Sequence, residues 1–216
     1  MTFETTTRGT FPLICDATGR LRTADRYDAP SLLADKCPVD FHAMIKPAGS
    51  ACNLGCDYCF YLSKATLPDG PGCKRMSEET LETFVRGYIR DVTADEVVFT
   101  WQGGEPTLRG LDFFRKAVAL QKKYARPGQT ILNDLQTNGT LLDEQWCRFL
   151  AEHDFLVGLS IDGPAHLHDA YRKTKKGSPT FRKVLDAIRL LRRFGVPFNT
   201  LTCVNRLNAA HPLEVY

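Results

Sequence analysis

The sequence predicts an α/β protein built on a parallel sheet. Apolar, β-branched runs alternate along the chain with amphipathic runs, and the connections between them are short. Strand followed by helix, repeated in this way, indicates right-handed βαβ units. Strands this apolar are expected to be buried on both faces, either in a doubly wound sheet or in part of a βα barrel. Because a complete eight-fold barrel needs about 250 residues, a barrel formed by this chain could only be a partial (β/α) barrel of about five βα units.

The expected strands and helices follow one another in chain order. Residues 41–46 form the first strand. A helix over 77–91 is expected next, because Ser77 is a suitable N-cap and acidic residues occupy the first turn. Further strands are expected over 96–102, 130–137, 155–161 and 196–204, and further helices over 111–124, 143–152 and 179–194. Asp143 is a suitable N-cap for the second of these helices. The last residues, 206–216, read as the opening of another helix, so we expect the chain to be part of something longer.

The expected organisation is one domain preceded by an irregular segment. Residues 1–40 mix Thr, Asp, Arg and Pro without periodicity, whereas residues 41–216 carry the βα pattern of a domain incomplete at its C-terminus. There is no secretory signal and no run of roughly 18 apolar residues, so we predict a cytoplasmic protein with no membrane partner. Cysteines in the cytoplasm are expected to be ligands, core residues or reactive groups, and not disulfides.

Basic residues are concentrated in one segment, although the net charge is only +3. Residues 172–193 contain nine basic residues and one acidic residue. A solvated helix face is favoured over a binding patch. An enzyme acting on RNA is the least favoured reading, because the segment has no aromatic residue for base stacking beyond Phe181.

Three thiols, Cys52, Cys56 and Cys59, are crowded into one loop with the spacing Cys-x3-Cys-x2-Cys. A structural zinc site normally has four ligands, and the remaining candidates are remote. Those candidates are Cys15, Cys37, Cys73, Cys147, Cys203 and His42. Cys147 and Cys203 lie in a helical and a strand pattern, and we expect both to be core residues. A 4Fe–4S cluster held by three thiolates keeps one iron open to an outside ligand, which explains the absence of a fourth nearby thiol.

Small-residue or polar motifs follow every expected strand. After the cysteine loop come QGGEP (102–106), QTNG (136–139), SIDG (160–163), and Asn205 with Arg206. Each motif alone would be explained by turn chemistry. Because the C-terminal ends of parallel strands meet at one rim, the motifs together predict a pocket there.

The cysteine loop, CNLGCDYCFY, resembles the cluster loop of radical S-adenosylmethionine (SAM) enzymes. Together with FTWQGGEPTL, LQTNGTLLDE and LVGLSIDGPAHLHDAYR, it is similar to the anaerobic sulfatase-maturating enzymes over about residues 41–206. The resemblance implies a partial barrel of the radical SAM type and a 4Fe–4S cluster whose open iron binds SAM. It also implies reductive cleavage of SAM to a 5′-deoxyadenosyl radical, and oxidation of a sulfatase Cys or Ser to Cα-formylglycine.

The resemblance also implies roles for individual residues. Cys52, Cys56 and Cys59 would ligate the cluster. The SAM contacts would be the methionyl amine at Gly103, Gly104 and Glu105, the carboxylate at Ser160 and Arg172, the adenine at the backbone of Tyr58, and the ribose at Gln136 and Asn138. Tyr61 and Gln102 would face the substrate. The general base is expected beyond Tyr216, so no catalytic residue is assigned within the chain.

The expected partners are a sulfatase polypeptide and an electron donor such as flavodoxin or ferredoxin, and nucleic acid is not expected. Two alternatives stay open. One is another peptide-modifying radical SAM enzyme, because related enzymes share the cluster loop. The other is a truncated, non-catalytic chain that binds a cluster without turnover.

Overall fold

A computed structural model describes residues 14–15, 21–22, 41–61 and 75–216. The chain divides into two compact units, Met1–Val39 and Asp40–Tyr216. In the first unit, β1 (Ile14–Cys15) pairs antiparallel with β2 (Leu21–Arg22), so the segment expected to be irregular contains a short strand pair. Two of the candidate fourth thiols, Cys37 and Cys73, lie outside the described residues.

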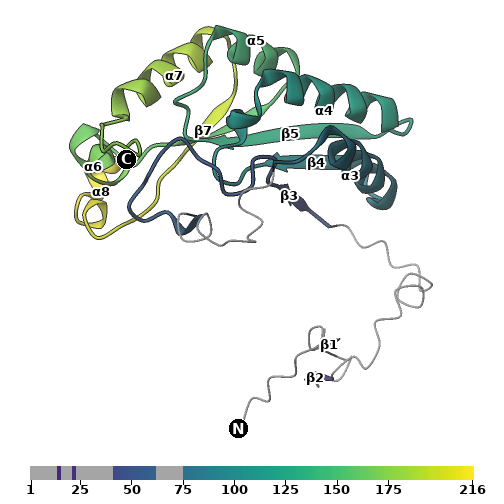
Figure 1. The fold of residues 1–216 in the computed structure, drawn as a ribbon, viewed down its shortest axis with the longest axis horizontal. Helices are drawn as coiled ribbons and strands as arrows, with labels where there is room; N and C mark the ends of the chain where they lie inside the picture. Colours follow the sequence, from purple (N-terminus) through teal and green to yellow (C-terminus); the bar gives the residue numbers. More distant parts are fainter. Residues whose placement is uncertain (1–13, 16–20, 23–40, 62–74) are drawn as a thin grey trace. The chain divides into compact units, whose positions relative to one another are not determined.

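The second unit contains one five-stranded sheet in the order β3-β4-β5-β6-β7, with every neighbouring pair parallel (Figure 1). The strands are β3 (Ala43–Ile45), β4 (Glu96–Trp101), β5 (Thr130–Thr137), β6 (Leu156–Ser160) and β7 (Phe198–Leu201). The predicted α/β fold with a parallel sheet is confirmed. The last strand is shorter than predicted, because beyond Leu201 the backbone N–H of Cys203 bonds the Asp162 carboxylate.

The helices begin where the sequence places their caps. Ser77 accepts a hydrogen bond from the backbone of Thr80 at 3.0 Å, and Asp143 accepts one from Trp146 at 2.9 Å. The longer helices are α3 (Glu78–Asp91), α4 (Leu111–Tyr124), α5 (Glu144–Glu152) and α7 (Phe181–Arg193). The shorter ones are η2 (Pro106–Arg109), α6 (Ala165–Tyr171), η3 (Asn208–Ala210) and α8 (Pro212–Val215). Within the ranges described, no helix has both the length and the apolar character that crossing a membrane requires.

The core lies between the helices and one face of the sheet. Along β4, Val97, Phe99 and Trp101 are at most 1% exposed, and they pack in one cluster with buried residues of α3, α4 and α5. Figure 1 shows α4, α5 and α7 along the same side of the sheet. On the other face, Leu132 and Leu156 remain 39–41% exposed. Consequently the alternation of the strands separates a covered face from an open one.

Candidate functional site

A cavity of about 240 Å³ lies at the C-terminal ends of the strands, where the rim motifs meet. Its lining residues are Cys52, Leu54, Cys56, Tyr58, Cys59, Phe60, Tyr61, Gln102, Gly103, Gly104, Gln136, Thr137, Asn138, Ser160, Arg172 and Cys203. The structure therefore brings together every residue that was given a role in the site except Glu105. Asn205 and Arg206, the predicted rim motif after the last strand, do not line the cavity either. Residues as far apart in the sequence as Cys52 and Cys203 share this one cavity.

The cysteine loop is fixed by backbone hydrogen bonds on two sides. On one side, the N–H groups of Gly104 and Glu105 bond the carbonyls of Gly49 and Ala51, at 2.9 and 2.8 Å. On the other side, the Gly55 N–H bonds the Lys173 carbonyl at 2.9 Å. The loop is thus held between the segment after β4 and the segment after α6.

The glycine pair of the QGGEP motif permits this close packing. A Cβ built on Gly104 would lie 2.2 Å from the Ala51 carbonyl oxygen and 2.5 Å from that of Ser50. Because both neighbours are backbone atoms, a side chain here would force the cysteine loop away from β4. Gly103 has a φ of +119°, which L-residues rarely adopt.

The thiols of the loop are partly or fully shielded from water. The Leu54 N–H and the Asn138 amide approach the Cys52 sulfur at 3.4 and 3.7 Å. Burial raises the pKa of Cys52, and it raises that of Cys56 to about 11, although the nearby Arg172 opposes the second shift. Both thiols are therefore protonated at neutral pH when no metal is present.

The donor set of the cavity fits an iron–sulfur cluster. Three soft thiol donors from one loop border one cavity, which is the ligand chemistry that such clusters use. Among the described side chains, no group of three or more His, Cys, Asp or Glu is already arranged around a metal position. The fit is therefore one of donor chemistry and location, not of preformed coordination geometry.

Asp162 connects the cysteine loop to Arg172. Its fully buried carboxylate accepts a hydrogen bond from the Tyr58 hydroxyl and forms an ion pair with Arg172 Nε at 3.0 Å. Burial would lower the pKa of Arg172, but the Asp162 charge beside it raises that pKa overall. Burial raises the pKa of Tyr58, so its hydroxyl stays a neutral donor. The guanidinium also faces the Tyr58 ring at 5.5 Å.

His168 does not line the cavity, but it is hydrogen-bonded to the backbone of Asp162 and to Thr180. Its ring is fully buried, and burial lowers its pKa to about 4, so the ring is neutral. Because the Asp162 backbone N–H donates to Nδ1 at 3.3 Å, the hydrogen lies on Nε2 and points to the Thr180 hydroxyl at 3.1 Å. That hydroxyl donates to the Arg172 carbonyl at 2.6 Å. The chain of bonds fixes the backbone of Arg172.

Glu105 lies behind the cavity and does not line it. It is 1% exposed, and its carboxylate accepts hydrogen bonds from the backbone and hydroxyl of Thr107, the hydroxyl of Thr137 and the backbone of Asn138, at 2.7–3.1 Å. Burial raises its pKa, and these donors oppose the rise. The Asn138 amide in turn donates to Asn53 at 2.9 Å. Glu105 thereby links the segment after β4 to the end of β5.

The two residues predicted to face the substrate both border the cavity. The Gln102 amide contacts the sulfur of Met44, whose side chain is 63% exposed on the open face of the sheet. The Tyr61 ring contacts the Phe60 ring in a tilted arrangement, with the ring centres 4.2 Å apart. Lys46 Nζ lies 5.5 Å from the centre of the Tyr61 ring.

Two thiols behave differently from one another. Cys147 is fully buried in α5, as predicted. The prediction of Cys203 as a core residue is wrong, because β7 ends at Leu201 and Cys203 is exposed and borders the cavity. His42 bonds the Thr100 hydroxyl at 2.6 Å and does not line the cavity.

Asp162 was not identified as a site residue from the sequence, because the dipeptide Asp-Gly in SIDG is typical of a turn.

Residues 47–216 match the family model of the Radical SAM superfamily. The chain therefore belongs to the radical SAM superfamily. This match confirms the resemblance identified from the sequence and the predicted partial-barrel fold. Within it, the chain is 51% identical over 175 residues to a serine-type anaerobic sulfatase-maturating enzyme from Bacteroides thetaiotaomicron, covering 81% of this chain and 42% of that protein. It is 45% identical over 173 residues to a cysteine-type enzyme from Clostridium perfringens, covering 80% and 46%.

The chain is also similar in structure to a solved protein of the same kind as these relatives. Native anSMEcpe with bound AdoMet and Cp18Cys peptide superposes with a TM-score of 0.76 at 43% identity, covering 82% of this chain and 47% of that one. The chain thus spans less than half the length of these sulfatase-maturating relatives.

Proposed function

We propose that this chain is a radical SAM oxidoreductase whose substrate is a sulfatase polypeptide, in which a Cys or Ser side chain is oxidised to Cα-formylglycine. The observation that carries the proposal is the single cavity bordered by three loop thiols, the glycine pair, Ser160 and Arg172. When bound there, a 4Fe–4S cluster supplies the electron that cleaves SAM to methionine and a 5′-deoxyadenosyl radical. The names of the relatives support a sulfatase substrate, and the peptide in the solved structure supports a peptide.

Cys52, Cys56 and Cys59 would hold the cluster, and the rim would hold SAM. Arg172 is suited to the methionyl carboxylate, because Asp162 engages only the Nε edge of a guanidinium that carries five donors. Ser160, which borders the same cavity, would bind the methionyl carboxylate together with Arg172. Gly103 and Gly104 bring backbone groups to the methionyl amine, with Glu105 fixing their position from behind. The remaining proposed contacts are the Tyr58 backbone for adenine, Gln136 and Asn138 for ribose, and Gln102 and Tyr61 for the substrate.

The proposed setting is the cytoplasm, where thiols stay reduced. The proposed source of electrons is a small redox protein such as flavodoxin or ferredoxin. The proposal assigns no catalytic base within the 216 residues.

The experiment is an anaerobic assay of 5′-deoxyadenosine formation. The chain is reconstituted with iron and sulfide and given dithionite and SAM, beside a Cys52→Ala, Cys56→Ala, Cys59→Ala triple variant. Product from the wild type alone supports the proposal. A fully reconstituted wild type without product would instead support the alternative of a cluster-binding chain without turnover.

The substrate is tested separately, with sulfatase peptides that carry Cys or Ser at the target position. Formylglycine detected by mass spectrometry supports sulfatase maturation. 5′-Deoxyadenosine without formylglycine would favour another peptide-modifying radical SAM enzyme.

A further inference from the structure

A basic turn, residues 173–179, lies directly against the cysteine loop. Leu54 forms an antiparallel bridge with Thr174, and the Gly55 N–H bonds the Lys173 carbonyl at 2.9 Å. A Cβ on Gly55 would lie 3.4 Å from the Cα of Lys175, so the two backbones are in van der Waals range. The turn therefore covers the backbone between the first and second thiols of the loop.

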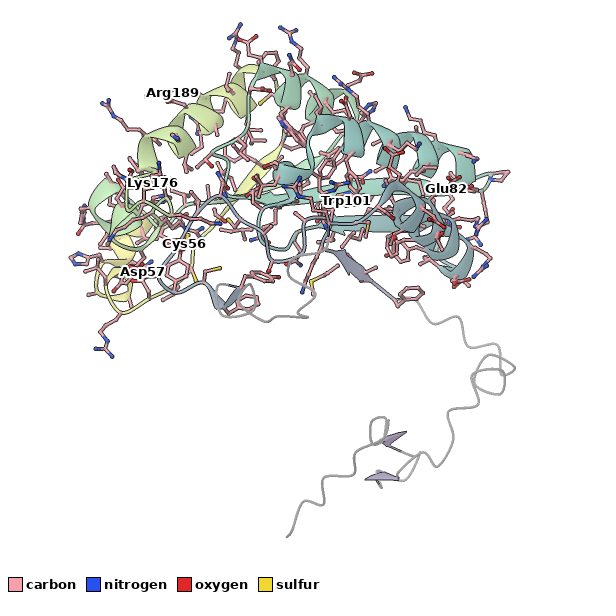
Figure 2. All side chains as sticks on the ribbon, viewed as in Figure 1. Cys56, Asp57, Glu82, Trp101, Lys176 and Arg189 are labelled. Atoms are coloured by element: carbon pink, nitrogen blue, oxygen red, sulfur yellow. The ribbon has the colours of Figure 1, made fainter. Side chains whose placement is uncertain are left out.

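The lysines of this turn are available to a partner. Lys175 and Lys176 are exposed, and neither makes an ion pair with any residue in the described part of the chain. Two other lysines are paired, Lys116 with Glu78 and Lys123 with Glu82. Figure 2 shows Lys176 on the same side of the molecule as Cys56 and Asp57, and far from Glu82.

The positive charge continues beyond the turn, because Arg182 and Lys183 are exposed in the first turn of α7. Two acidic residues lie beside this region. Asp57 is exposed in the cysteine loop, and its backbone N–H bonds the Tyr171 carbonyl at 3.1 Å. The Asp169 carboxylate accepts hydrogen bonds from the backbone N–H groups of Thr180 and Phe181 at 2.8 and 2.9 Å. Two acidic residues beside five basic residues, including Lys173, leave the surface with a net positive charge. Such a surface attracts negatively charged partners and raises their association rates.

The turn is also ordered by its own hydrogen bonds. The Thr174 N–H donates to the Ser178 carbonyl at 2.9 Å, and the Ser178 N–H donates to the Thr174 hydroxyl at 3.0 Å. Lys173 and Pro179 form a bridge that closes the turn. The lysines thus project from a fixed backbone.

We propose that the basic turn is the docking surface for an acidic one-electron donor protein. The inference rests on the proposed function, which requires one electron at the cluster: the donor is oxidised by one electron, the cluster is reduced by one, and no atom is transferred. A donor docked here is separated from the thiol loop by a single layer of backbone. Electron-transfer partners use small interfaces, and one turn plus the start of a helix offers a surface of that kind.

Nucleic acid is the other polyanion that such charge attracts. Base stacking needs exposed aromatic rings, and the aromatic residue of this segment, Phe181, is half-buried with its ring 5.7 Å from that of His168. Residues 172–193, all of which the structure describes, contain no fully exposed aromatic ring for stacking, which favours a protein partner.

The test compares a Lys175→Gln/Lys176→Gln variant with a matched control, Lys122→Gln/Lys123→Gln on α4, in the reconstituted 216-residue chain. The rate of 5′-deoxyadenosine formation is measured with reduced flavodoxin and, separately, with dithionite. We expect the turn variant to lose about tenfold in kcat/KM for flavodoxin at low ionic strength, with the difference shrinking as salt screens the charges. The dithionite rate and the control variant should match the wild type.

The outcomes separate the inference from the proposed function. If the wild type gives no 5′-deoxyadenosine even with dithionite, the proposed function is wrong and the inference falls with it. If dithionite supports turnover but the turn variant accepts electrons from flavodoxin as fast as the control, the docking surface is elsewhere. If the turn variant instead loses binding of a single-stranded RNA oligonucleotide while its flavodoxin kinetics stay normal, the turn belongs to a nucleic-acid partner.

Discussion

Asp162 joins three segments that are remote in the sequence. Its carboxylate contacts Tyr58 in the cysteine loop, Arg172 after α6 and the backbone of Cys203 after β7. A fully buried carboxylate is tolerated only when its charge is compensated and its oxygens are bonded. In the proposed function, Asp162 is therefore a positioning residue that would act on SAM through Arg172.

An Asp162→Asn substitution should weaken both the fold and SAM binding. It leaves the guanidinium of Arg172 buried without a counter-ion, so we expect a loss of about 3–5 kcal/mol in the free energy of unfolding, measured with urea. In enzyme that still folds, KM for SAM should rise about tenfold while kcat at saturating SAM changes little. A role in the fold alone would leave that KM unchanged.

The control is Asp186→Asn, which breaks an Asp–Arg pair with Arg189 whose side chains are 65% and 73% exposed. Exposed pairs contribute roughly 0–1 kcal/mol, so its unfolding curve should stay close to that of the wild type. If both variants lost the same free energy of unfolding, burial of the Asp162–Arg172 pair would not be the reason for its contribution to stability.

His168 should make stability depend on pH. Its pKa is lowered from 6.5 to about 4 in the folded chain, so the unfolded chain binds the proton first as pH falls. Stability is therefore present above pH 6.5 and is lost toward pH 4, by up to about 3 kcal/mol. In a His168→Asn variant, urea unfolding at pH 7 and pH 4.5 should show a smaller difference than in the wild type. An unchanged difference would place the pH dependence on another group.

At the scale of helices and strands, local signals predicted most of the fold. The caps at Ser77 and Asp143 fixed the starts of α3 and α5 from the sequence. α6 was not predicted, because seven residues are too few for helical periodicity to stand out. The rim motifs predicted the cavity because parallel strands end at one edge whatever their side chains do.

Side-chain direction at the rim could not be predicted in the same way. Glu105 turns behind the cavity because Thr107, Thr137 and Asn138 supply donors there, and those donors come from segments up to 33 positions away. Cys203 borders the cavity because its backbone N–H donates a hydrogen bond to the Asp162 carboxylate, so it does not continue the pairing of β7 with β6. Both outcomes depend on tertiary contacts that no local pattern records.

Substitution by alanine should have opposite effects on stability at two glycines. Gly104→Ala places a Cβ 2.2 Å from a backbone oxygen, so we expect severe destabilisation and loss of SAM binding. Gly87 lies within α3 with nothing within 4 Å of an added Cβ, so Gly87→Ala should stabilise the chain by about 0.5–1 kcal/mol. Thermal melting and SAM binding by equilibrium dialysis measure both effects. A Gly104→Ala variant that melts with the wild type would mean that the loop moves aside freely.

At the scale of the whole molecule, the sheet is covered on one side only within the described ranges. Parallel sheets are normally buried on both faces, yet Leu132, Leu156 and Leu201 are 39–41% exposed, and Met44 is 63% exposed. Much of the stability of the chain must therefore come from the helix side, and ligand binding at the rim should add to it measurably.

Reconstitution of the cluster should raise the melting temperature. Binding to the folded chain at about a thousand times Kd adds roughly 4 kcal/mol, which corresponds to roughly 10 °C for a chain of this size. The Cys52, Cys56, Cys59 triple variant should show no such rise. Cys203→Ala should keep it, because the three loop thiols suffice as ligands. Loss of the rise and of bound iron in Cys203→Ala would make the exposed fourth thiol a ligand as well.

The order within the basic turn has a kinetic consequence. Because its backbone is already fixed, a partner that docks there need not freeze a mobile loop, and little conformational entropy is lost on association. The contact can then be weak and still oriented, so a spent donor dissociates quickly and a fresh one takes its place. The frequency of reduction would be limited by encounter with the donor, and not by rearrangement of the surface that receives it.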